Sequence, residues 1–274
     1  MTNVGPFEPR VALASLSGAS DAAWARRAAD HAGCAFLGGI ALDRDTRAAA
    51  RALVAREREE FLPDDPVAFV ERELAALDGV PLRAGVNVRS ATLDPVRAVA
   101  RVCRDRDAIL EVNAHCRQDE MCAAGAGEAL LRDPDRLCEQ VAAASDEGAV
   151  VGAKVRAEVS GVDLPDLARR IEAAGGEVIH VDAMDSEAVV ADVVDACDLF
   201  VIANNGVRDR ATVEEYLDHG ADAVSVGRPS DNPAVLARVR RAADAWFAGE
   251  RGPPPGERAP EREGDVEREE GADA

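Results

Sequence analysis

Eight short apolar segments alternate with amphipathic stretches along most of the chain, and this alternation limits the possible fold more than any other feature. Each apolar segment has the length of a buried strand, and each stretch that follows has helical periodicity. Near-continuous apolar strands are typical of a parallel sheet covered on both faces, with short right-handed connections. The expected strands are residues 11–16, 34–41, 82–88, 108–112, 149–155, 177–181, 199–203 and 223–226.

Eight β/α units predict a single (β/α)₈ barrel, the TIM barrel, and the chain of 274 residues fits its usual size of about 250. An open doubly wound sheet would show a similar alternation and stays an alternative. We assign residues 1–249 to the barrel. Residues 250–274 are acidic and rich in Pro and Gly, with almost no apolar side chain, so we expect a disordered tail.

The charge of the chain is strongly unbalanced, with 52 acidic and 32 basic residues and a formal net charge of −20. Excess acid and a single lysine resemble proteins of extreme halophiles. Molar salt shortens the Debye length to about 3 Å, so the acidic surface does not exclude an RNA partner there. No apolar run approaches the roughly 20 residues of a membrane span, and no leader is apparent, so we expect a soluble cytoplasmic protein with reduced cysteines.

Polar residues and glycines gather where the expected strands end. In barrels of this kind the loops after the strands form the active face. Any one of these residues could be an ordinary cap or turn residue, but together they predict a site at the carboxyl ends of the strands. They are Asn87, Asn113, Cys116, Lys154, Arg156, Asp182, Asn205, Gly206, Gly227 and Arg228.

Lys154, the only lysine of the chain, stands at the end of the fifth strand. A compact ammonium there can donate to the edge of an anionic ring and stabilise its charge, a role that a planar guanidinium fills differently. Arg156 lies on the same face by strand alternation and is either a structural ion-pair partner or a substrate contact. Gly206, Gly227 and Arg228 occupy the loops that commonly bind phosphate in these barrels.

Cys116 follows the fourth strand directly. A thiol that is protonated at neutral pH can act as a general acid, which is our interpretation of this residue. Cys116, Cys122 and His115 could also be read as metal ligands, but one such pair without a second cluster is a weak signal, and we expect no metal. His180 and the remaining histidines receive no functional assignment.

Four segments together resemble the dihydrouridine synthases, which are FMN enzymes that reduce uridine in tRNA. The segment ALASLSGASDAAW resembles, from Ala14, the family's opening A-P-M-x-G-x-T-D-x-x-F. Residues 113–131 keep the spacing of its N-x-G-C-P…G-x-x-L-L segment. VGAKVR resembles its V-x-x-K-x-R strand, and IANNGV with VSVGRPSDNP resembles its paired N-G and G-R-x-x-x-N-P phosphate loops. The resemblance runs over roughly residues 11–240.

The resemblance implies a role for each candidate residue. Cys116 is implied as the catalytic acid, NADPH as the electron donor and tRNA as the substrate. FMN would contact Ser15, Asn87, Lys154, Asn205, Gly206, Gly227 and Arg228, and the substrate would contact Asn113, Arg156 and Asp182.

The chain departs from the family pattern at several site positions. His115 and Arg117 replace the Gly and Pro beside the cysteine, Asp182 stands in place of a histidine, and Asn87 replaces a glutamine. A helical tRNA-binding segment is not apparent beyond Phe247. Two alternatives therefore stay open: a small-molecule FMN oxidoreductase similar to dihydroorotate dehydrogenase that acts on a free pyrimidine, and a non-catalytic barrel that binds flavin or phosphate.

Overall fold

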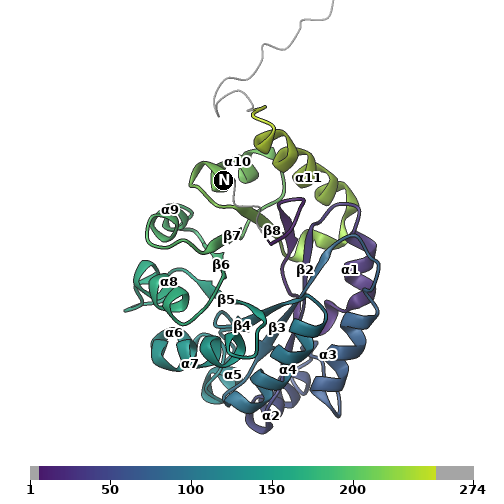
Figure 1. Ribbon diagram of the computed structural model, residues 1–274, viewed down its shortest axis with the longest axis vertical. Coiled ribbons are helices and arrows are strands. Elements are labelled where there is room, and N and C mark those ends of the chain that lie inside the picture. Colours follow the sequence, from purple (N-terminus) through teal and green to yellow (C-terminus); the bar gives the residue numbers. More distant parts are fainter. Residues whose placement is uncertain (1–5, 251–274) are drawn as a thin grey trace, which may run out of the picture.

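The computed structural model describes residues 6–250, and its eight parallel strands close into a barrel in sequence order. Helices surround the ring of strands (Figure 1). This confirms the predicted (β/α)₈ barrel and excludes the open doubly wound sheet. The strands are β1 Val11–Leu13, β2 Cys34–Ala41, β3 Arg83–Arg89, β4 Ile109–Asn113, β5 Val150–Arg156, β6 Val178–Asp182, β7 Phe200–Asn204 and β8 Ala223–Val226.

Helices begin where the sequence offers a cap. Asp21, Asp43, Asp65 and Asp163 are among the N-cap residues whose carboxylates accept backbone N–H bonds in the first turn. The α-helices are α1 Ala22–Ala28, α2 Arg44–Val54, α3 Pro66–Ala75, α4 Leu93–Asp105, α5 Asp119–Ala123, α6 Ala129–Arg132, α7 Pro134–Ser145, α8 Leu164–Ala173, α9 Val189–Val194, α10 Arg210–Asp218 and α11 Pro233–Phe247, and the 3-10 helices are η1 Ser17–Ala19 and η2 Arg228–Asp231.

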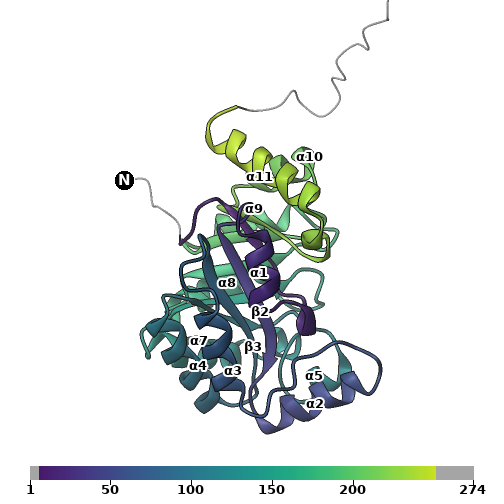
Figure 2. The ribbon, with the colours of Figure 1, turned by 90° about the vertical axis from the view of Figure 1, so that its right-hand side faces the viewer.

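Two connections hold more than one α-helix. Between β2 and β3 lie α2 and α3, and between β4 and β5 lie α5, α6 and α7. Figure 2 shows α2 and α5 side by side at one end of the molecule, and their residues contact one another. These two helices cover the loop that follows β4, which carries Cys116.

The interior of the barrel changes from apolar to polar along its axis. Toward the amino ends of the strands the filling is apolar, with Phe7, Ala12, Cys34, Phe36, Ile109, Val178, Ile202 and Ala223 in one cluster. Farther along the strands the buried interior residues are polar: Asn87, Glu111, Lys154, His180, Asn204 and Ser225. Because a buried polar layer is costly unless its groups are paired, this layer marks the face at which a functional site is expected.

Two sequence expectations need correction here. Asn87 does not end its strand, because β3 continues to Arg89 and leaves Asn87 fully buried inside the barrel. His180 was given no role, whereas it lies in the middle of β6 and in the polar layer. The predicted tail lies outside the described residues, apart from Glu250. Within residues 6–250, none of the helices combines the length and the apolarity that crossing a bilayer requires.

Candidate active site

Two adjoining cavities open at the carboxyl ends of the strands. The first, here called the Lys154 cavity, has a volume of about 460 Å³, and the second, the Cys116 cavity, has about 550 Å³. Residues that line both are Ser15, His115, Asp182, Asn205 and Arg228. A separate cavity of about 470 Å³ lies at the opposite end of the barrel around Phe7 and Arg83, away from the polar layer. The two adjoining cavities are the candidate site.

The structure brings together all but one of the residues singled out from the sequence. Ser15, Lys154, Asp182, Asn205, Gly206, Gly227 and Arg228 line the Lys154 cavity. Asn113, Cys116 and Arg156 line the Cys116 cavity. Asn87, expected beside a bound ring, lies beneath these cavities and lines neither.

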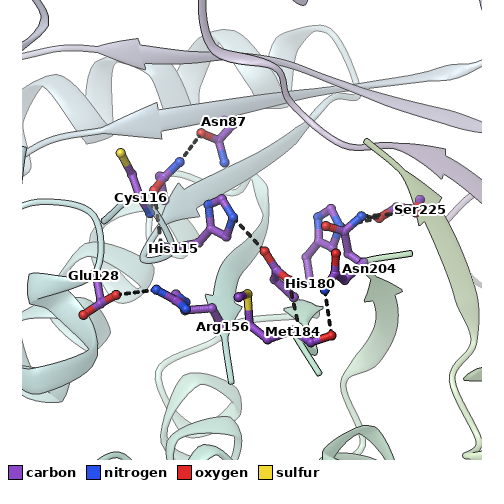
Figure 3. A network of polar contacts seen from close by, with 12 residues as sticks. Asn87, His115, Cys116, Glu128, Arg156, His180, Met184, Asn204 and Ser225 are labelled. Atoms are coloured by element: carbon purple, nitrogen blue, oxygen red, sulfur yellow. Dashed lines mark hydrogen bonds and ion pairs between the residues drawn. The ribbon is translucent and has the colours of Figure 1, made fainter. Parts of the chain in front are cut away.

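Asn87 instead fixes the loop that carries Cys116. Its side-chain N–H donates to Glu111 Oε1 at 2.6 Å, and its carbonyl oxygen accepts from Asn113 Nδ2 at 2.8 Å. The Asn113 oxygen in turn accepts the backbone N–H groups of His115 and Cys116, at 3.2 and 2.9 Å. A chain of buried amides therefore determines where His115 and Cys116 lie in the loop after β4 (Figure 3).

Glu111 and His180 form a buried pair in the centre of the barrel. His180 Nδ1 lies 2.7 Å from Glu111 Oε2, and its Nε2 lies 2.7 Å from Ser225 Oγ. The same Oγ accepts a hydrogen bond from Asn204 Nδ2 at 2.8 Å. Burial lowers the pKa of His180, and the nearby Lys154 charge lowers it further. Burial raises the pKa of Glu111, but its contact with His180 and the charge of Lys154 outweigh this, so the net pKa is below the usual value. We therefore assign a carboxylate beside a neutral imidazole that donates through Nδ1.

Lys154 is 3% exposed and lines the cavity named after it. Its ammonium makes no hydrogen bond or ion pair to another side chain in the described part of the chain. Burial lowers the pKa of Lys154, whereas the carboxylates of Glu111 and Asp182 act in the opposite direction. A buried cation without a direct partner, at the wall of a cavity, is a suitable donor for an anionic ligand.

The loops after β7 and β8 have the features of a phosphate cradle. Asn205 and Gly206 both have positive φ, 104° and 65°, and Asn205 Nδ2 donates to the Met184 carbonyl at 2.6 Å, which fixes this turn. A Cβ added to Gly227 would meet nothing within 4 Å, so its side-chain direction is open space beside the cavity. Arg228 is exposed there and forms no ion pair within residues 6–250. Backbone that can be approached closely, together with an unpaired guanidinium, fits a phosphate group.

Buried arginines form the wall of the Cys116 cavity. Arg156 Nη1 pairs with Glu128 at 2.8 Å, and Arg89 Nη1 pairs with Glu60 at 2.6 Å (Figure 3 shows the first pair). Of the two roles considered for Arg156, the structure shows the ion pair. In both arginines the buried Nε–H finds no acceptor among the described residues.

His115 and Asp182, two of the departures from the family pattern, meet at the boundary of the two cavities. His115 Nε2 lies 2.9 Å from Asp182 Oδ2, although the residues come from the loop after β4 and the end of β6. The backbone N–H of Met184 donates to Asp182 Oδ1 at 3.3 Å. Nothing in the sequence alone joins His115 to Asp182.

The Cys116 side chain lines its cavity but also packs against an apolar cluster that includes Ala49, Leu53 and Met121. Figure 3 shows its sulfur and the His115 ring pointing in different directions. The six cysteines are all free thiols. Within the described residues there is no group of three or more His, Cys, Asp and Glu side chains arranged to hold a metal ion.

The residues missed from the sequence are Glu111, His180 and Ser225. Strand alternation contained a signal for two of them, because Glu111 stands two residues before Asn113 and His180 two residues before Asp182. Both members of such a pair face the same side of the sheet. A candidate residue at the strand end therefore predicts a second interior residue two positions earlier in the strand, one layer deeper in the barrel.

Comparisons with solved structures give the same fold. The M276A mutant of FabK from Thermotoga maritima superposes with a TM-score of 0.53 at 16% identity, over 85% of this chain and 64% of that chain. Thiamine phosphate pyrophosphorylase from Pyrococcus furiosus superposes with a TM-score of 0.50 at 11% identity, over 85% of this chain and 96% of that chain.

Sequence comparisons extend the likeness beyond the fold. An uncharacterized protein of Methanocaldococcus jannaschii is 26% identical over 236 residues, which are 81% of this chain and 89% of that protein. A probable tRNA-dihydrouridine synthase of Rhizobium leguminosarum bv. phaseoli is 29% identical over 144 residues, which are 47% of this chain and 45% of that protein. The family model for dihydrouridine synthase (Dus) matches residues 86–253, more than half of the sequence. The chain therefore belongs to the dihydrouridine synthase family.

Proposed function

We propose that this protein is an FMN-dependent oxidoreductase that reduces the C=C bond of a uracil base, with tRNA as its substrate and NADPH as the electron donor. The observation that supports this most directly is the arrangement of the two cavities. A buried, unpaired lysine and two phosphate-type loops line one of them, and a loop cysteine lines the other. The family match and the name of the rhizobial relative support the reaction and the substrate.

In this proposal, Gly206, Gly227 and Arg228 hold the FMN phosphate. Lys154 and Ser15 contact the ring. Asn205 fixes the turn after β7, which carries Gly206. Asn87 supports the site from below through Asn113 and Glu111. When bound, reduced FMN supplies a hydride to one carbon of the uracil double bond.

The neighbouring carbon must then receive a proton, for which Cys116 Sγ–H is the proposed source. Asn113 and Arg156 line the Cys116 cavity and are proposed to contact the substrate. The Arg156–Glu128 pair keeps that guanidinium in place at the wall of the cavity.

The test is Cys116→Ala, which removes the proton donor without touching the Lys154 cavity. We expect reoxidation of the reduced flavin by uridine-containing RNA to slow by roughly 10²–10⁴, the usual contribution of a general acid. Flavin binding and reduction by NADPH should be unchanged. Stopped-flow absorbance measures the two half-reactions separately.

Cys138→Ala is the matched control, because Cys138 lies in α7 and does not line either cavity. Equal reoxidation rates in Cys116→Ala and the parent with every oxidant would remove Cys116 as the acid. Reoxidation of the parent by free pyrimidines alone would favour the small-molecule oxidoreductase, and a protein that binds no flavin would refute the proposal as a whole.

A further inference from the structure

The His115–Asp182 pair gives the site a ring nitrogen whose hydrogen-bonding role can be determined. Asp182 is mostly buried, with 13% of its side chain exposed, and accepts from Met184 N–H as well as from His115. Burial raises the pKa of Asp182, but its contact with His115, the charge of Lys154 and the hydrogen bond from Met184 outweigh this, so its pKa is below the usual value. Asp182 is therefore a carboxylate at neutral pH, and a carboxylate can only accept hydrogen bonds.

Because Asp182 can only accept, His115 Nε2 must carry a hydrogen. In a neutral imidazole the other nitrogen, Nδ1, then has a lone pair and is an acceptor. Nδ1 makes no hydrogen bond within residues 6–250. About a third of the His115 side chain is exposed, and the residue lines both cavities. The site therefore presents one oriented acceptor where the two cavities meet.

The neutral form of His115 is favoured by its surroundings. Partial burial at the barrel mouth lowers the pKa of His115, and the Lys154 charge from β5 and His180 from β6 act in the same direction. The Asp182 carboxylate raises it but does not outweigh these influences, so the net pKa is below the ordinary value. At neutral pH the ring is therefore uncharged, and Nδ1 stays an acceptor.

We propose that His115 Nδ1 accepts a hydrogen bond from the ring N–H of the substrate base and thereby selects uracil. The imide N3 of uracil carries a hydrogen, whereas the matching nitrogen of cytosine is itself an acceptor and would face Nδ1 lone pair to lone pair. This makes His115 a specificity-determining residue, and Asp182 the residue that positions it. The inference rests on the proposed function, because it assumes that the base enters the Cys116 cavity.

The rigidity of the pair supports this role. The backbone at His115 is held by the Asn113 side chain, which is held by Asn87, and Asp182 ends a strand of the barrel. A ring fixed at both its backbone and its Nε2 cannot turn to offer a donor without breaking the contact with Asp182. Mismatched bases therefore leave a buried polar group unpaired, which is how a site rejects an analogue that lacks the right donor.

The tautomer can be tested without substrate or turnover. Two-bond ¹⁵N–¹H correlation spectra distinguish the tautomers of the four histidines. His115 should carry its proton on Nε2, whereas His180, which donates through Nδ1 to Glu111, should be the opposite tautomer in the same protein. Asp182→Asn should release the His115 preference and leave His180 unchanged. An imidazolium or an Nδ1–H tautomer at His115 at neutral pH would overturn the inference.

Recognition is tested with short oligouridylate and its N3-methyl counterpart, which lacks only the proposed donor. The parent should bind the unmodified strand about tenfold more tightly, the usual effect of one hydrogen bond of this kind. His115→Ala should bind both strands equally. His219→Ala, at the distant C-terminal end of α10, should keep the parent's preference.

The outcomes separate this inference from the proposed function. A preference that survives in His115→Ala, or a parent without a preference, would overturn the role of His115 even if the reduced protein still transfers hydride to uracil. If the parent shows the preference and His115→Ala lacks it, the recognition role stands. If in addition neither the oligouridylate nor tRNA reoxidises the reduced flavin of the parent, the proposed reaction is refuted.

Discussion

Replacing Glu111 tests whether the polar layer inside the barrel stabilises the fold. The carboxylate is 1% exposed and accepts from Asn87 and His180 at 2.6 and 2.7 Å. Glu111→Ala leaves both donors buried without an acceptor, at about 1–3 kcal/mol each, and adds a small cavity. We therefore expect a loss of about 4 kcal/mol in the free energy of unfolding, or roughly 8–16 °C in Tm for a barrel of this size.

Glu111→Gln separates the charge from the hydrogen bonds. The glutamine keeps an acceptor for Asn87 and offers an N–H to His180, whose ring can shift its proton to Nε2. Ser225 must then accept from His180 and from Asn204, and its own hydrogen loses its partner. Because two charge-assisted bonds become neutral ones, we expect a loss of about 1–2 kcal/mol.

The measurement is urea unfolding of flavin-free protein at one fixed salt concentration, followed by circular dichroism and extrapolated linearly to water. Glu71→Gln on the exposed face of α3 is the control and should stay within about 0.5 kcal/mol of the parent. A loss below about 1 kcal/mol in both Glu111 variants would refute the reasoning, because the buried donors would then have found other acceptors.

The barrel could be predicted from the sequence because its main determinant is local. Most of each strand had to be apolar, and each connection had to contain an amphipathic helix, so the eight units could be counted without knowledge of any contact. The glycines and Arg228 after β7 and β8 were found for a related reason: they follow strands directly, and all parallel strands of a barrel end on the same face.

The residues of the polar layer could not be assigned in this way, because their roles depend on contacts across the barrel. Asn87 was placed at a strand end when β3 continues for two more residues to Arg89. That difference moves its side chain from the cavity wall to the layer below. Strand alternation places His180 on the same face as Asp182, but its role depends on Glu111 and Ser225, which come from β4 and β8.

The pairing of His115 with Asp182 was beyond the sequence for the same reason, although both residues had been singled out. Each departs from the family pattern by itself, and a single sequence does not show that one loop supplies the imidazole and another strand the carboxylate that orients it. Their contact turns two separate departures into one arrangement with a definite hydrogen-bonding direction.

Two further predictions concern cofactor binding and acid stability. Arg228→Ala and Lys154→Met should each weaken FMN binding by about 1.5–3 kcal/mol in fluorescence titrations, whereas Arg240→Ala on α11 should not; unchanged affinity in both variants would remove the proposed phosphate and ring contacts. The pKa of His180 is lowered in the folded protein, so the unfolded chain binds its proton first and stability should fall as the pH drops below about 6.5. Because the pKa values of Glu111 and Asp182 are also lowered, the stability they contribute is present above the ordinary carboxyl range and is lost as the pH falls below about 4.5. Unfolding titrations across this range should therefore show two declines on acidification. In Glu111→Gln no carboxylate at this position takes up a proton, so the lower decline should be flatter. A lower decline of undiminished slope in that variant would mean that other carboxylates cause it.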